Sequence, residues 1–157
     1  GHLQEGKRSI GINYFKKAEF QKSLEYYKAA LRIQKAHLSK ENELVSRTYQ
    51  NVGIVAAKLN HYEEAIESIQ AAIDVNVKLY GESHLEVARS KRILGWVYYN
   101  LGDNDKALKA YQESLDILIP IFKENKDPLL AEVYSAIGRI HLDDGRYSLA
   151  EKNLNKA

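Results

Sequence analysis

The sequence contains no cysteine and no methionine, and it has only two prolines among its 157 residues. Without cysteine, a disulfide framework and a thiolate metal site are both excluded, which fits a reducing compartment. The prolines, Pro120 and Pro128, lie late in the chain, so the earlier part is free to be helical. No apolar run is long enough to span a bilayer, and no signal-peptide pattern is present. We therefore expect a cytoplasmic protein without membrane association.

An excess of charge of one sign is also lacking. The formal net charge of +2 is too small to indicate nucleic acid or a membrane surface as a partner. The composition, 45% hydrophobic and 28% charged, is that of a folded domain rather than a disordered chain. Length and composition together predict one domain that covers residues 1–157.

What the sequence does contain is an internal repeat. Glycine follows a large apolar residue at Gly11, Gly53, Gly95 and Gly138, with a period of about 42 residues. Three further positions recur after each glycine, in the same order. The first is small (Ser23, Ala65, Ala107, Ala150), the second is large (Tyr27, Ile69, Tyr111, Leu154) and the third is small again (Ala30, Ala72, Ser114, Ala157). We predict repeats over approximately 3–38, 42–80, 83–122 and 127–157.

Each repeat is predicted to contain two helices. In the third, Val87, Leu94 and Tyr98 follow the spacing of a helix with one buried face. Ser83 is expected to cap its start, and Gly102 to end it in a left-handed conformation. The corresponding turns contain Phe20 in the first repeat, Asn60 and Tyr62 in the second and Tyr147 in the fourth.

Further capping residues open other helices. Asp103 follows the predicted turn of the third repeat, and Asp127 precedes Pro128 at a predicted helix start. The two terminal repeats are incomplete, and neither end carries the polar capping helix that closes most arrays. We expect the chain to be a piece of a longer array, and an unfinished last repeat makes a homodimer one alternative.

These residues resemble the tetratricopeptide repeat, in which Leu-Gly, tyrosine and alanine recur in this order. The junction from Leu79 to Ala88, LYGESHLEVA, is similar to that of the long repeats of kinesin light chains, with Leu85 in place of a proline. The resemblance covers essentially the whole chain. It implies an all-α fold, a right-handed solenoid of about four stacked antiparallel helix pairs, whose concave face holds a peptide or a partner's helix.

The first helix of each repeat carries a second stripe of side chains, which the resemblance assigns to that concave face. We predict that the groove is lined by Arg8, Phe15, Lys16, Arg47, Gln50, Asn51, Ile54, Lys58, Arg89, Arg92, Trp96, Tyr99, Asn100 and Arg139. In repeats one to three the stripe is rich in lysine and arginine, and Glu5 is its one acid. In repeat four the stripe contains Glu132, Ser135, Arg139 and Asp143. Trp96 fits packing against the neighbouring repeat equally well.

The hypothesis that follows is a non-enzymatic adaptor or scaffold for proteins or peptides. An extended acidic segment with apolar anchors would lie in the groove, because arginine can hold a carboxylate through two parallel hydrogen bonds. The alternative explanation for the lysines and arginines of the stripe is that a long helix needs a polar face toward solvent. The alternatives are a regulatory or sensor domain of a larger signalling protein, such as a peptide-pheromone-responsive regulator or a module fused to an enzyme, and a self-association scaffold.

A search for catalytic or metal-binding residues finds no convincing site. No phosphate-binding glycine loop and no serine–histidine–acid arrangement is present. His141, Asp143 and Asp144 are close in sequence, but His141 occupies a repeat position that is normally packed. We therefore expect no enzyme activity, no cofactor and no metal. The groove is also too sparse in lysine and arginine for nucleic acid.

Overall fold

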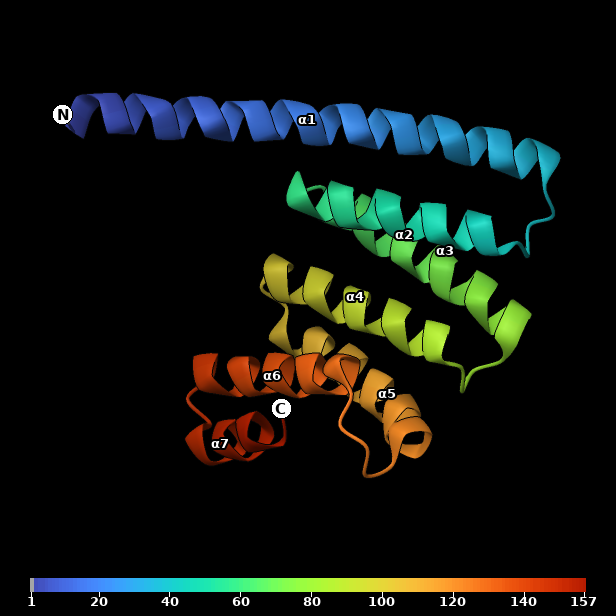
Figure 1. Ribbon diagram of the computed structural model, residues 1–157, viewed down its shortest axis with the longest axis vertical. Coiled ribbons are helices and arrows are strands. Elements are labelled where there is room, and N and C mark those ends of the chain that lie inside the picture. Colours follow the sequence, from blue (N-terminus) through green and yellow to red (C-terminus); the bar gives the residue numbers. More distant parts are fainter. Residues whose placement is uncertain (1) are drawn as a thin grey trace.

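The computed structural model describes the backbone of residues 2–157 and the side chains of residues 16–157. Within this part the chain forms seven helices. They are α1 (His2–His37), α2 (Glu43–Lys58), α3 (Tyr62–Tyr80), α4 (Leu85–Leu101), α5 (Asn104–Phe122), α6 (Pro128–Asp143) and α7 (Tyr147–Lys156). Helices α2–α3, α4–α5 and α6–α7 are antiparallel pairs that stack in chain order (Figure 1). The predicted all-α architecture of stacked helix pairs is confirmed.

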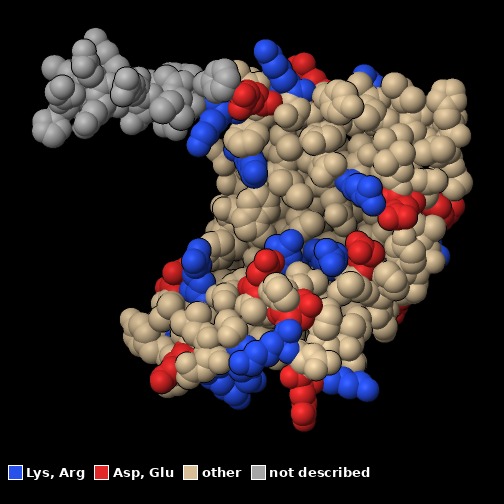
Figure 2. All heavy atoms as spheres, viewed as in Figure 1, with Lys and Arg blue, Asp and Glu red and all other residues tan. Residues whose placement is uncertain are grey.

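The pairs are arranged so that their first helices form one continuous row. Helix α2 contacts α4, and α4 contacts α6. Helices α3 and α5 contact the helices directly before and after them in the chain. The molecule curves around a hollow, and along the lower border of that hollow Lys or Arg and Asp or Glu lie close together (Figure 2). The row of α2, α4 and α6 is the face to which the resemblance assigns the groove.

The first repeat differs from the prediction, because α1 is one continuous helix of 36 residues and the turn expected near Phe20 is absent. In the other repeats the turn contains a residue with positive φ: Asn60 at 63°, Gly102 at 92° and Gly145 at 76°. Ala18 occupies the matching position in the first repeat. A β-carbon disfavours the left-handed conformation by about 1–2 kcal/mol per residue. Alanine instead favours continuation of the helix.

The predicted caps are confirmed at Asp103 and Asp127. Asp103 accepts a hydrogen bond from the backbone N–H of Lys106, and Asp127 accepts one from that of Leu129. The cap predicted at Ser83 is wrong by one residue. His84 is the capping residue of α4, since its Nδ1 accepts a hydrogen bond of 3.0 Å from the Glu86 N–H.

A buried polar network joins the second repeat to the third. Ser46 on α2 donates to the Asn76 Oδ1 at 2.7 Å, and the Asn76 amide donates to the Ser90 hydroxyl on α4 at 3.0 Å. All three side chains are buried. At the next interface the matching positions hold Ala88, Leu118 and Val133, each fully buried in an apolar cluster. Neighbouring repeats are therefore joined by two chemically different contacts.

Candidate functional site: a pocket between α4 and α6

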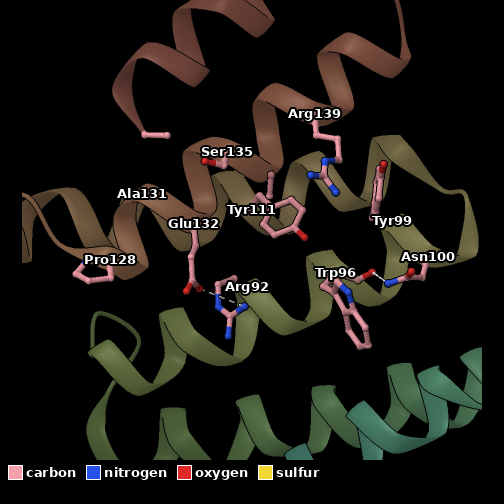
Figure 3. Close-up of a pocket in the computed structure, with 12 residues that line it drawn as sticks. Arg92, Trp96, Tyr99, Asn100, Tyr111, Pro128, Ala131, Glu132, Ser135 and Arg139 are labelled. Carbon is pink, nitrogen blue, oxygen red and sulfur yellow. Dashed lines mark hydrogen bonds and ion pairs between the residues drawn. The ribbon is translucent and has the colours of Figure 1, made fainter. Parts of the chain in front are cut away.

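A pocket of about 800 Å³ opens on the concave face between α4 and α6. Arg92, Trp96, Tyr99 and Asn100 line it from α4, Glu132, Ser135 and Arg139 from α6, and Tyr111 from α5 (Figure 3). Five predicted groove residues, Arg92, Trp96, Tyr99, Asn100 and Arg139, therefore lie around one cavity. Aromatic side chains and arginines line this pocket together, a combination enriched at the energetic centres of protein interfaces.

The inner wall of the pocket is the side chain of Tyr111, which is only 4% exposed. Its ring lies against the backbone of α4 at Gly95. Burial raises the pKa of the Tyr111 hydroxyl to about 12, while the positive charges of Arg92 and Arg139 act in the opposite direction. Tyr111 thus stays neutral and can donate a hydrogen bond into the pocket.

Trp96 belongs to the pocket and to the core at the same time. It is half-buried, and it packs against both hydrophobic clusters of the molecule. Figure 3 shows its ring pointing toward the preceding repeat, away from α6. The neighbouring Asn100 donates its amide to the Trp96 carbonyl at 2.8 Å. Trp96 therefore lines the pocket and also packs against the core, so the two predictions for this residue are compatible.

Tyr99 and Asp143 connect α4 to α6 at one end of the pocket. The Tyr99 hydroxyl donates a hydrogen bond of 2.7 Å to the Asp143 carboxylate. This bond raises the pKa of Tyr99, and burial and the Asp143 charge add to the effect, whereas the Arg139 charge lowers it. Figure 3 shows Arg139 directed toward the space between Tyr99 and Tyr111.

Arg92 has a partner on the opposite side of the pocket. Its Nη1 lies 3.6 Å from a carboxylate oxygen of Glu132, whose side chain is 59% exposed. Within the described residues the buried Arg92 Nε has no hydrogen-bond partner. One nitrogen of the guanidinium, Nη1, therefore has an acidic partner, whereas the buried Nε has no hydrogen-bond acceptor in the described part of the chain.

The predicted groove residues on α2 are in part occupied by other contacts. Arg47 pairs with Glu43 one turn away, and Gln50 donates to the Ser90 hydroxyl. The Lys58 ammonium lies 5.2 Å from the centre of the Phe20 ring. Ile54 packs on the core, and Asn51 is half-buried. None of these side chains lines the pocket between α4 and α6.

Three predicted residues lie at the first repeat, and Arg89 lies on α4. The side chains of Arg8 and Phe15 fall outside the described residues, and Lys16 is exposed on α1. Arg89 pairs with Glu86, with 3.6 Å between Nε and a carboxylate oxygen, and it does not line the pocket. The structure brings together the predicted residues of repeats three and four only.

Sequence reasoning missed Tyr111 as a pocket residue, whereas it placed Glu132 on the concave stripe of the fourth repeat. Tyr111 belongs to the second helix of its repeat, so the pattern assigns it to the core. It reaches the concave face because Gly95 leaves space for its ring. A tyrosine opposite a helix glycine was the available signal. Glu132 was visible as an acid at the position that Arg47 and Arg89 occupy in the two preceding repeats.

The residues considered for metal binding do not form a site. His141 accepts a hydrogen bond of 2.9 Å at Nδ1 from Arg146, whose guanidinium also contacts Asp144. Among the described residues no group of three or more metal-binding side chains is clustered. In the same part of the chain, every helix is too short or too polar to cross a membrane.

Comparison with protein families identifies the repeat. Models of the tetratricopeptide repeat match residues 6–76 and 62–119, and a second model with the same description matches residues 131–157. No curated protein matches the sequence.

Solved structures share the fold. The chain is similar to BtubC (BKLC) from P. vanneervenii, with 24% identity and a TM-score of 0.80, over 88% of this chain and 55% of that one. It is similar to a protein described as a kinesin light chain of Podospora anserina, with 15% identity and a TM-score of 0.73, over 91% and 67% of the two chains.

A third similar structure is the MamA protein, with 20% identity and a TM-score of 0.56, over 94% of this chain and 86% of that one.

The chain spans about half the length of BtubC, the first of these relatives. The helix pairs, the repeated small residues and the family matches agree: the chain belongs to the tetratricopeptide repeat family and is structurally similar to the repeat domains of kinesin light chains.

Proposed function

We propose that the chain is a non-enzymatic adaptor whose concave face binds an extended acidic segment of a partner protein. Domains of this family are generally protein-interaction modules. The observation that supports the finer proposal is the pocket between α4 and α6, which Arg92, Arg139 and the neutral Tyr111 line together with Trp96 and Tyr99. A ligand carboxylate would meet two cations and a neutral donor there.

A ligand must compete with ion pairs that the arginines of the concave face already form. Arg47, Arg89 and Arg92 each already contact an acid of this chain. The acids they contact are at least 42% exposed, so these pairs contribute about 0–1 kcal/mol each. A ligand carboxylate that binds these arginines through two parallel hydrogen bonds can therefore replace them.

Binding can be followed through Trp96, because it is the single tryptophan of the chain and lines the pocket. We suggest titration with a blocked peptide that alternates glutamate and leucine, compared with a peptide in which glutamine replaces glutamate. Binding of the glutamate peptide at least about tenfold tighter is expected. Equal affinity for the two peptides would contradict the acidic-ligand proposal.

A double variant locates the site. Arg92→Glu with Arg139→Glu is expected to weaken binding of the glutamate peptide by at least about tenfold, since two attractive charges that line the pocket become repulsive. The control is Lys78→Glu with Lys109→Glu, which changes the net charge equally on exposed positions of α3 and α5. Equal losses in both variants would indicate a general charge effect. The sensor-domain and self-association alternatives stay predictions.

A further inference from the structure

We propose that Glu132 is an internal competitor for Arg92, and that it sets how tightly the pocket between α4 and α6 holds an acidic ligand. This inference rests on the proposed function and names the residue that limits it. The position of Glu132 carries arginine in the two preceding repeats, Arg47 and Arg89. In the fourth repeat the sign of the charge at this position is therefore reversed.

The geometry explains how Glu132 acts. Its carboxylate extends from α6 across the pocket toward the guanidinium of Arg92 on α4 (Figure 3). The two groups lie 3.6 Å apart, which is an ion pair but longer than a strong charged hydrogen bond. Glu132 thus occupies the position of a ligand carboxylate without making the parallel two-bond contact that arginine can form.

The exposure of the pair makes it exchangeable. Glu132 is 59% exposed and Arg92 is 33% exposed, so water screens their attraction and its net stabilisation is small. A ligand carboxylate that forms the shorter, parallel two-bond contact with Arg92 can therefore replace Glu132.

Two consequences follow for ligand selection. A ligand carboxylate must compete with Glu132, so one isolated acidic group gains little. A ligand with several acids, or with an apolar anchor beside the acid, gains enough elsewhere to complete the exchange. Glu132 therefore selects against weakly acidic segments, an example of specificity obtained from a repulsive element.

The test compares Glu132→Gln with the unchanged chain, using the glutamate–leucine peptide and its glutamine counterpart. Glu132→Gln frees Arg92 and is expected to tighten binding of the glutamate peptide by about two- to fivefold. Affinity for the glutamine peptide should not change, because that peptide carries no carboxylate to compete. The matched control is Glu113→Gln, which makes the same charge change at a pair with Lys91 away from the pocket.

Each outcome decides between the proposals. Tighter binding of the glutamate peptide in Glu132→Gln alone supports the competitor role. Unchanged or weaker binding, or an equal gain in Glu113→Gln, overturns it while leaving the groove proposal intact. If the unchanged chain does not prefer the glutamate peptide, the proposed function itself fails. Circular dichroism of the variants verifies that all of them are folded.

Discussion

A β-carbon added at Gly95 would lie 2.9 Å from the ring of Tyr111. The glycine of the first helix and the large residue of the second helix are thus in direct contact, and the same glycine allows Tyr111 to form the inner wall of the pocket. One small residue therefore determines both the closeness of the helix pair and the depth of the candidate site.

Gly95→Ala is expected to destabilise the protein by about 1–3 kcal/mol, because the Tyr111 ring must move within a packed core. The pocket should also bind the glutamate peptide more weakly. Chemical denaturation and Trp96 fluorescence measure the two effects. In a double-mutant cycle with Tyr111→Ala most of the cost of Gly95→Ala should disappear. A cost that persists in that background would show that the ring contact is not its cause.

Asn76→Leu is expected to destabilise the second interface by about 1–3 kcal/mol, because Ser46 and Ser90 lose a buried hydrogen-bond partner. The triple variant Ser46→Ala, Asn76→Leu and Ser90→Val reproduces the apolar residues found at the next interface. It should recover most of that loss, since all three polar side chains of the buried network are replaced together and only the half-buried Gln50 loses a partner. A triple variant that is less stable than Asn76→Leu alone in urea denaturation would contradict this account.

Gly102→Ala is expected to destabilise the protein by about 1–2 kcal/mol, because Gly102 has a φ of 92° that alanine adopts only with strain. Gly102→Asn should cost less, since Asn60 holds the equivalent turn at a φ of 63°. Thermal denaturation of the two variants gives the comparison. Equal melting temperatures for the alanine and asparagine variants would argue against left-handed strain as the cause.

Stability should fall at mildly acidic pH through His141. Burial and the charge of Arg146 hold its pKa below the usual value of 6.5, against the attraction of Asp144. The folded state therefore binds a proton less readily than the unfolded state. Stability contributed by neutral His141 is present above the unfolded pKa of 6.5 and is lost as the pH falls through and below it.

The measurement is the melting temperature on both sides of that pKa, for the unchanged chain and for His141→Gln. Glutamine is neutral at either pH and can still accept the hydrogen bond that Arg146 donates. The decrease on acidification should be smaller in His141→Gln. An equal decrease in the two proteins would show that other groups are responsible.

Much of the fold could be predicted because its determinants are local. The glycine and alanine positions recur in step, and the caps at Asp103 and Asp127 depend on residues two or three positions away. The error in the first repeat was also local in origin. The repeat pattern suggested a turn near Phe20, but Ala18 lacks the left-handed preference that Asn60 and Gly102 supply at the matching position.

The candidate site was predicted only in part. Periodicity placed Arg92 and Trp96 on one side of a helix, because side chains three or four residues apart share a side. The resemblance to the tetratricopeptide repeat assigned that side, and Arg139 of the next repeat, to the concave face. It assigned Arg47 and Arg89 to the same groove, but both pair with an acid of their own helix and neither lines the pocket. Helical spacing gives the direction of a side chain and does not give its partners.

The sequence by itself therefore determined the helix pairs of repeats two to four and their order. Only the tertiary structure decided that Tyr111 of α5 lines the pocket between α4 and α6. It also decided that Trp96 packs against both hydrophobic clusters and that Glu132 forms an ion pair with Arg92. The physical reason is the range of the interactions. Helix formation and capping depend on neighbours within one turn or two, whereas these contacts join helices whose separation is set by the packing of several side chains at once.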